Sequence, residues 1–207
     1  ITAGLSTVGL RAPAHPIALA LIREAGIPIA APSANLSGKP SPTVSKHVID
    51  DLNGRVDVII DGGSADIGVE STVLDVTTDI PVILRPGGVS FEQLKEVLGN
   101  VAMDPSLMKK PSGDFVPKAP GMKYTHYSPK ADVIVVEGEP LKVAEKINSL
   151  IMEYQSKDIP VGVLATKQTK ELYKGVPLIT LGDRLEPATI AANLFKAFRD
   201  FDDIGIR

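Results

Sequence analysis

Hydroxyl, amide and ammonium groups are concentrated in one short segment, Ser33-Ala34-Asn35-Leu36-Ser37-Gly38-Lys39-Pro40-Ser41-Pro42-Thr43. This segment follows an apolar run over residues 27–31, predicted to be a buried strand, and precedes a predicted helix over residues 44–52 capped by Thr43. Ligands of open α/β sheets bind at the carboxyl ends of strands, and these groups are suited to phosphate. A Walker loop is absent, and a polar turn leading into a helix cap would have the same composition.

Two arginines lie where a ligand could reach them. Arg11 ends the run Thr7-Val8-Gly9-Leu10-Arg11, and Arg85 opens Arg85-Pro86-Gly87-Gly88 at the end of a predicted strand. A guanidinium group can hold a carboxylate or a phosphate with two parallel hydrogen bonds. The hydroxyls of Glu70-Ser71-Thr72 precede another predicted strand. Surface arginines and ordinary turns would give the same pattern, so both interpretations stay open from these residues alone.

Residues 104–130 contain five prolines and read as an extended linker. Tyr124, His126 and Tyr127 are unexpected in such a segment, because a plain spacer does not need aromatic side chains. We expect these side chains to dock either on a domain surface or on a ligand.

Apolar periodicity and turn residues predict the elements that position these groups. Ser90-Phe91-Glu92-Gln93 forms a capping box at the start of a helix that Gly99 ends. A hairpin is predicted from strands 71–76 and 81–85, and strand–helix–strand alternation beyond residue 131 predicts a parallel α/β domain. Further helices are predicted over residues 16–25 (mostly buried), 140–154 and 187–201, and further strands over 56–60, 133–136, 161–165 and 178–181.

Composition excludes several classes of protein and of site. The 207 residues include no cysteine, which excludes disulfides, cysteine-ligated zinc, iron–sulfur clusters and cysteine nucleophiles. No apolar stretch approaches the roughly 18 residues of a membrane span. A net charge of −3 and an aromatic content of 4% argue against general nucleic-acid binding.

Other absences narrow the chemistry and the location. His15, His47 and His126 lack the spacing of metal ligands, so no transition-metal site is expected. The chain begins at Ile1 with no signal peptide, so we expect a piece of a longer protein. The missing cysteines fit a cytoplasmic location.

Five groups of residues, in order along the chain, resemble motifs of a known family. Thr7-Val8-Gly9-Leu10-Arg11 with Pro13-Ala14-His15-Pro16, then Ala31-Pro32-Ser33-Ala34-Asn35-Leu36-Ser37-Gly38, Glu70-Ser71-Thr72-Val73 and Leu84-Arg85-Pro86-Gly87 resemble the YrdC-like domain. The linker Pro120-Gly121-Met122-Lys123-Tyr124-Thr125-His126-Tyr127-Ser128-Pro129 and the block after it resemble the long, two-domain form of the threonylcarbamoyl-AMP synthase family. The resemblance covers essentially the whole chain.

The resemblance implies an α/β fold with two domains. Residues 1–108 would be the C-terminal part of a YrdC-like domain, a twisted open mixed sheet with helices. Residues 109–131 would be an ordered Pro-rich linker, and residues 132–207 a small, truncated Rossmann-like parallel α/β domain. The family's domain begins upstream with a basic phosphate site, so we expect residues 1–207 alone to have little or no synthase activity.

The resemblance also implies a reaction. Threonine and bicarbonate would form N-carboxythreonine, whose carboxylate attacks the α-phosphate of ATP and releases pyrophosphate. The product, threonylcarbamoyl-AMP, would pass to the machinery that forms threonylcarbamoyladenosine in tRNA. Attack at phosphorus depends on positioning and charge neutralisation, so no catalytic nucleophile and no protein-held metal is assigned. Magnesium would accompany the triphosphate.

Site residues follow from the same resemblance, position by position. Arg11, Ala31 (through its backbone) and Ser71 would contact threonine, with Arg11 holding its carboxylate. The ATP contacts would be Thr7, Ser33, Asn35, Ser41, Arg85 and Tyr127. Tyr124 is a rival to Tyr127 as the aromatic residue that covers the nucleotide.

Two other functions stay open at this stage. A YrdC-like domain also occurs in the carbamoyl-transfer protein of hydrogenase maturation, but that protein carries zinc-finger cysteines and this chain has none. A non-catalytic nucleotide- or RNA-binding module is the second alternative, and weak RNA binding fits either it or the synthase. RNA binding that depends on salt and is indifferent to ATP would favour the module.

Overall fold

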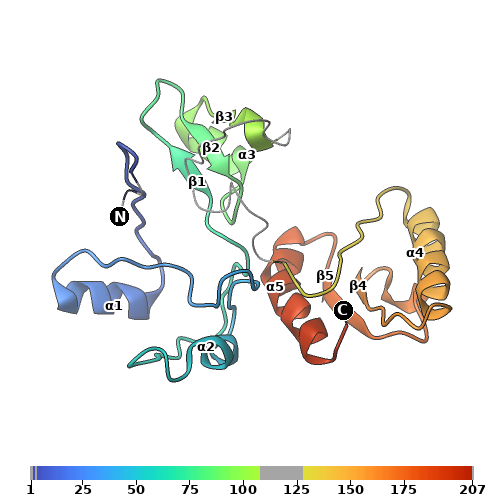
Figure 1. The fold of residues 1–207 in the computed structure, drawn as a ribbon. Coiled ribbons are helices and arrows are strands. Elements are labelled where there is room, and N and C mark those ends of the chain that lie inside the picture. Colours follow the sequence, from blue (N-terminus) through green and yellow to red (C-terminus); the bar gives the residue numbers. More distant parts are fainter. Residues whose placement is uncertain (1, 3, 108–127, 207) are drawn as a thin grey trace. The chain divides into compact units, whose positions relative to one another are not determined.

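The computed structural model describes residues 2, 4–107 and 128–206, and Figure 1 shows its helices and strands. The chain divides into two compact units that alternate along the sequence. The first consists of Ile1–Ala34, Ile60–Gly62 and Glu70–Tyr124, and the second of Asn35–Ile59, Gly63–Val69 and Thr125–Arg207. Residues 35–59 therefore group with the C-terminal part of the chain. Most of the predicted linker lies outside the described residues.

A three-stranded mixed sheet organises the first unit. β1 (Val73–Asp75) pairs antiparallel with β2 (Val82–Arg85), and β2 pairs parallel with β3 (Ala102–Met103). The predicted hairpin is confirmed. Its turn is supported by the Asp75 carboxylate, which accepts hydrogen bonds from the N–H and the hydroxyl of Thr77 at 2.9 and 2.6 Å. Ile83 of β2 is only 2% exposed and marks the core of this unit.

The helix after the sheet begins as predicted. α3 (Phe91–Leu98) has a complete capping box, in which the Ser90 hydroxyl accepts the Gln93 N–H at 3.2 Å and the Gln93 side chain accepts the Ser90 N–H at 2.8 Å. Gly99 ends the helix. A short 3-10 helix, η1 (Pro105–Leu107), follows β3. The capping box was predictable because all its hydrogen bonds lie within four residues.

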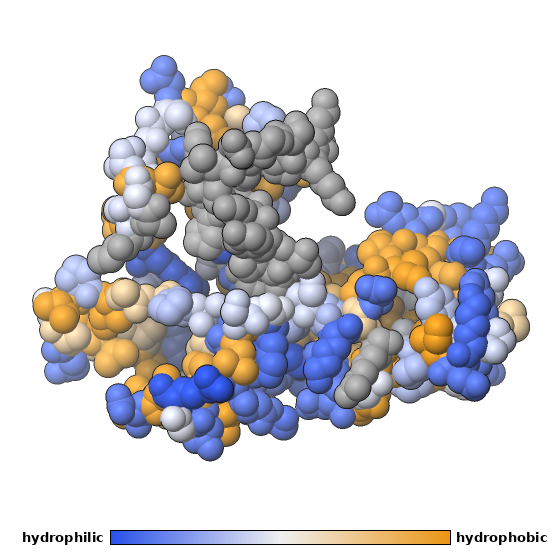
Figure 2. Space-filling model, in the orientation of Figure 1, coloured by the Kyte–Doolittle hydropathy of each residue, from blue (hydrophilic) through white to orange (hydrophobic). Residues whose placement is uncertain are grey.

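α1 (Pro16–Ala25) has the predicted bounds, with Pro16 at its first position and Gly26 in the left-handed conformation at its end (φ 63°). The prediction that this helix is mostly buried is wrong, because none of its residues is buried. A helix buries its apolar side only where another element packs on it, and among the described elements none packs extensively on α1. Apolar residues also reach the surface elsewhere, as the orange atoms of Figure 2 show, and Leu10 is 91% exposed.

The second unit contains a parallel α/β arrangement. β4 (Val163–Thr166) pairs parallel with β5 (Leu178–Gly182), and η2 (Lys170–Leu172) lies between them in the sequence. α4 (Pro140–Gln155) precedes this pair, and α5 (Pro187–Asp203) follows it and packs on β5. These elements confirm the predicted helices and strands to within about two residues. The core is formed by Ala144, Ile151, Val163, Ala165 and Tyr173.

α2 (Ser45–Leu52) belongs to the second unit and starts one residue later than predicted. The predicted cap, Thr43, is not the residue before the helix; Val44 is, and its side chain gives no capping hydrogen bond. The Thr43 N–H instead donates to Nδ1 of His47 at 3.2 Å, and the Thr43 carbonyl accepts the Ala65 N–H at 2.8 Å. These bonds fix the backbone of Thr43 outside the helix.

Three predicted strands are wrong. Residues 27–31, 56–60 and 133–136 are not strands in the structure. A strand exists only where a second backbone segment completes its hydrogen bonds, and the described residues offer no partner strand to these apolar runs. Apolar composition alone therefore overestimated the number of strands.

We expect core truncation to destabilise the second unit. Ile151 is 5% exposed, and Ile151→Ala should lower the free energy of unfolding by about 2–5 kcal/mol, because it removes buried methyl groups and leaves a cavity. Urea unfolding followed by far-UV circular dichroism would measure the change. Ile204 is 61% exposed, and Ile204→Ala is the matched control with an expected effect below about 1 kcal/mol. Equal losses in the two variants would contradict this assignment of the core.

Candidate functional site

Arg85 and Ser71, two of the predicted site residues, are in direct contact. Nε and Nη2 of Arg85 donate to the carbonyl oxygen of Ser71 at 3.1 and 2.9 Å. Nη2 also lies 3.6 Å from the Glu70 carboxylate, and both side chains of this ion pair are largely shielded from solvent. The guanidinium of Arg85 is thus fixed beside residues 70–71, at the carboxyl end of β2.

Hydrogen bonds join residues 70–72 to the loop that follows β2. The Gly88 N–H donates to the Glu70 carbonyl at 2.9 Å. The Thr72 hydroxyl donates to the Val89 carbonyl at 2.6 Å and accepts the Val89 N–H at 3.1 Å. A Cβ at Gly87 would overlap backbone atoms of Glu70 and Thr72, so only glycine permits this approach. The two segments therefore form one closely packed piece.

The segment of residues 35–43, here called the polar loop, is closed by Asn35. Its side-chain amide donates to the carbonyls of Leu36 and Lys39 at 2.9 and 3.1 Å. The Asn35 Oδ1 is buried and has no hydrogen-bond partner within the described part of the chain. Asn35 therefore shapes the loop through its NH2 group.

Asp51 of α2 anchors the polar loop. Its carboxylate accepts the Leu36 N–H at 3.3 Å, Lys39 Nζ at 2.6 Å and Arg199 Nη2 at 2.8 Å, and its side chain has 0% exposure. Burial alone would raise the pKa of Asp51. The hydrogen bonds from Arg199, Lys39 and Leu36 outweigh burial and lower that pKa to about 2. The carboxylate therefore stays ionised at neutral pH.

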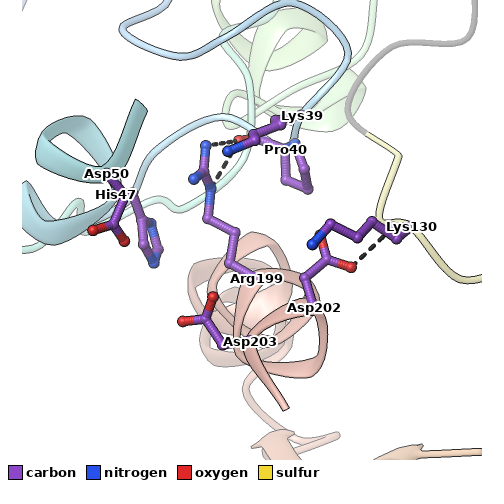
Figure 3. Close-up of a pocket in the computed structure, with 8 residues that line it drawn as sticks. All are labelled: Lys39, Pro40, His47, Asp50, Lys130, Arg199, Asp202 and Asp203. Atoms are coloured by element: carbon purple, nitrogen blue, oxygen red, sulfur yellow. Dashed lines mark hydrogen bonds between the residues drawn. The ribbon is translucent and has the colours of Figure 1, made fainter. Parts of the chain in front are cut away.

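Arg199 of α5 completes these contacts, and the pair of Asp51 and Arg199 is here called the anchor. Besides its bond to Asp51, its Nε and Nη2 donate to the Pro40 carbonyl at 3.0 and 2.6 Å. Figure 3 shows the guanidinium of Arg199 directed at Pro40. Arg199 is 7% exposed, and its contacts join residues 159 and 148 positions apart in the sequence. This contact is the link between α5 and the polar loop.

His47 lies buried close to this anchor. Its Nδ1 accepts the Thr43 N–H at 3.2 Å, which places the proton of the neutral ring on Nε2. Burial, and then the positive charge of Arg199, lower the pKa of His47 below its usual value. The ring is therefore neutral at pH 7 and acts as a hydrogen-bond acceptor for the loop.

A small pocket lies beside the anchor, drawn in Figure 3. It is lined by Lys39, Pro40, His47, Asp50, Lys130, Arg199, Asp202 and Asp203. Charges of both signs face it, and the Lys130 N–H donates to the Asp202 carboxylate at 2.9 Å. None of the predicted threonine or ATP residues lines this pocket. Within the described ranges, no group of three or more histidine, aspartate or glutamate side chains could hold a metal ion.

The other predicted site residues are placed separately. Thr7, Arg11, Ala31 and Ser33 are exposed, and Ser41 is partly buried in the polar loop. The Arg11 side chain makes no hydrogen bond or ion pair with any residue that the structure describes, which leaves its guanidinium available to a ligand. Tyr127 and its rival Tyr124 lie outside the described residues.

Two family models match consecutive parts of the chain. One, described as telomere recombination (Sua5_yciO_yrdC), matches residues 1–87. The other, described as the C-terminal domain of threonylcarbamoyl-AMP synthase, matches residues 89–207. The chain belongs to the threonylcarbamoyl-AMP synthase (Sua5) family.

Named relatives agree with this assignment. Threonylcarbamoyl-AMP synthase from Bacillus subtilis is 51% identical over 203 residues, which are 98% of this chain and 57% of that protein. The protein of the same name from Pyrococcus abyssi is 50% identical over 206 residues, 100% of this chain and 58% of that protein. The chain thus spans a little over half the length of these relatives.

Solved structures of the Sua5 family confirm the predicted α/β fold class. P. abyssi Sua5 complexed with L-threonine has a TM-score of 0.89 and 49% sequence identity. The match covers 100% of this chain and 58% of the P. abyssi chain. A variant of the same Sua5, in which an adjacent histidine and tyrosine are both alanine, also has a TM-score of 0.89, at 48% identity.

None of the helices in the described residues is long and apolar enough to cross a membrane.

Sequence reasoning missed the anchor of the polar loop. Asp51 and Arg199 were read as ordinary residues of predicted helices, and they lie 148 positions apart. The one local signal is that Asp51 and Arg199 are charged residues on amphipathic helices. Many surface residues share that placement, so it does not identify a buried ion pair. Only the tertiary contact distinguishes them.

We expect the stability contributed by Asp51 to fall in acid. A carboxylate with a lowered pKa stabilises the fold above its unfolded pKa of about 3.8 and loses that effect as the pH falls toward 2. At pH 6, Asp51→Asn should cost about 3–5 kcal/mol, because it leaves Arg199 buried without its counter-charge. Between pH 6 and pH 3, the difference in the free energy of unfolding between Asp51→Asn and the native chain should narrow by about 1 kcal/mol.

Urea unfolding at several pH values measures this difference. Asp50→Asn is the matched control, because Asp50 is the neighbouring carboxylate on α2 and pairs with Lys46 at the surface. Its substitution should change stability by less than about 1 kcal/mol at every pH. A cost of Asp51→Asn that does not vary with pH would contradict the lowered pKa.

Proposed function

We propose that this chain is part of an enzyme that makes threonylcarbamoyl-AMP from L-threonine, bicarbonate and ATP. The threonine nitrogen would take up the carbon of bicarbonate with loss of water to form N-carboxythreonine. An oxygen of the new carboxylate would then attack the α-phosphorus of ATP, and the bond to pyrophosphate would break. The enzyme would be a nucleotidyltransferase.

The observation that carries this proposal is the match over the whole chain to relatives of that name. Identities of 50–51% extend over 98–100% of the chain, and a Sua5 structure complexed with L-threonine has the same fold at a TM-score of 0.89. The contact between Arg85 and the Ser71 carbonyl adds a physical argument, because a guanidinium that is held in place suits a phosphate or carboxylate ligand.

For threonine, the proposed contacts are Arg11, Ala31 and Ser71. Arg11 is exposed, and its planar guanidinium can hold a carboxylate with two parallel hydrogen bonds. The Ala31 backbone and the Ser71 side chain supply polar groups for the amino acid. The Ser71 carbonyl already accepts two bonds from Arg85, so its hydroxyl is the group left for a ligand.

For ATP, the proposed contacts are Thr7, Ser33, Asn35, Ser41, Arg85 and Tyr127. Tyr127 would cover the nucleotide. His126-Tyr127 is the one adjacent histidine–tyrosine pair in this sequence, and the replaced pair in the P. abyssi Sua5 variant has the same residue types. Mg²⁺ would accompany the triphosphate, where phosphate oxygens and water would hold it and its charge would neutralise theirs.

The proposed product would be used by the enzymes that transfer threonylcarbamoyl groups to tRNA. A cytoplasmic location and weak contact with RNA would both be compatible with a role in tRNA modification. A mixed anhydride of this kind reacts readily with water, which favours direct use by a following transfer reaction.

Pyrophosphate release by the full-length gene product tests the function. Release should require both threonine and bicarbonate in addition to ATP. Release that does not require threonine would point to another acceptor, such as that of a carbamoyl-transfer domain. A folded protein without any release, but with salt-dependent RNA binding, would support a binding module instead.

Arg11→Ala should lower kcat/KM for threonine by roughly 10- to 100-fold, because it removes charge-assisted hydrogen bonds to the carboxylate. The same pyrophosphate assay, with threonine varied at saturating ATP, measures the effect. Arg23→Ala is the matched control, since Arg23 is an exposed arginine of α1 in the same unit. If the two variants had equal activity, Arg11 would not hold threonine.

A further inference from the structure

We infer that Arg199 of α5 is a positioning residue for the nucleotide, because it holds the polar loop in the shape that presents Asn35 and Ser41. This inference rests on the proposed function, in which both residues contact ATP. Arg199 lies in the part of the chain matched by the C-terminal domain model, whereas the loop lies in the part matched by the other model. The C-terminal part would thus support nucleotide binding indirectly, by holding the loop.

The loop is fixed at both of its ends. The Leu36 N–H, directly after Asn35, donates to Asp51, and the Pro40 carbonyl, directly before Ser41, accepts two bonds from Arg199. Lys39 pairs with the same Asp51 carboxylate at 2.6 Å. Asn35 and Ser41 therefore each adjoin a backbone group that is bonded to Asp51 or Arg199.

The geometry requires a guanidinium group. Arg199 donates from Nε and Nη2 to the Pro40 carbonyl oxygen and from Nη2 to the Asp51 carboxylate, so one guanidinium makes three hydrogen bonds. A lysine ammonium is a single point charge without a fixed fork of donors, so it could not reproduce this pattern. Arg199→Lys keeps the charge and removes the fork.

Loss of Arg199 would act on the loop more than on the rest of the fold. The Pro40 carbonyl would lose both of its bonds from the guanidinium, and Asp51 would keep Lys39 as its cationic partner. A buried carboxylate with weaker compensation favours structures that admit water. We expect the polar loop to be the segment that moves, because Leu36, Lys39 and Pro40 of this loop make the bonds to Asp51 and Arg199.

Steady-state pyrophosphate release by the full-length gene product tests the inference. KM for ATP and KM for threonine are measured for the native protein, Arg199→Met, Arg199→Lys and Lys196→Met. Lys196 is the matched control, because it is a cation on the same helix that pairs with Asp200 at the surface. Thermal unfolding of each variant shows whether it is folded at the assay temperature.

We expect Arg199→Met to raise KM for ATP about tenfold, the loss corresponding to one charge-assisted hydrogen bond, and to change KM for threonine by less than about twofold. Arg199→Lys should lie between Arg199→Met and the native protein, and Lys196→Met should match the native protein. If Arg199→Met does not fold, Arg199→Lys tests the inference: its KM for ATP should rise while its KM for threonine stays nearly unchanged.

Other outcomes overturn the inference. Equal changes in both KM values, or a fall in kcat alone, would mean that Arg199 acts only on the general fold. An unchanged KM for ATP in a folded variant would mean that the loop does not need the anchor. If the native protein releases no pyrophosphate, the proposed function fails and the inference fails with it; an active native protein separates the two.

Discussion

The buried ion pair between Arg199 and Asp51 is the constraint on which the polar loop depends. A carboxylate with no exposure is tolerated only when charge and hydrogen bonds compensate it, and Arg199, Lys39 and the Leu36 N–H together do so. Because these partners come from α5 and the loop, whereas Asp51 lies in α2, satisfying one buried charge fixes three parts of the second unit in a single arrangement. The Pro40 carbonyl is held by the same guanidinium.

The first unit also holds an arginine side chain in place, but with different partners. Arg85 is held by a backbone carbonyl and by the partly buried carboxylate of Glu70, and Gly87 allows the two backbone segments to approach. Arg11, in contrast, has its side chain exposed. In the proposed reaction, fixed cations suit a phosphate whose position must be constant, whereas an available arginine suits a substrate carboxylate that binds and leaves.

Local features were predicted well because their hydrogen bonds close within a few residues. The capping box at Ser90, the Gly26 cap of α1 and the hairpin of β1 and β2 depend on neighbours in the sequence. Predicted strands over residues 27–31, 56–60 and 133–136 failed, since a strand needs a partner that apolar composition does not supply. The predicted domain limits at residues 108 and 131 stay predictions.

The sequence by itself determined the family, the fold class and the order of the motifs, because each motif is a short run whose residue types can be recognised in place. Only the tertiary structure decided which charged residues hold the polar loop in place. Arg199 and Asp51 are separated by 148 positions, and no local pattern in the sequence encodes their pairing. Long-range compensation of a buried charge is a property of the folded chain.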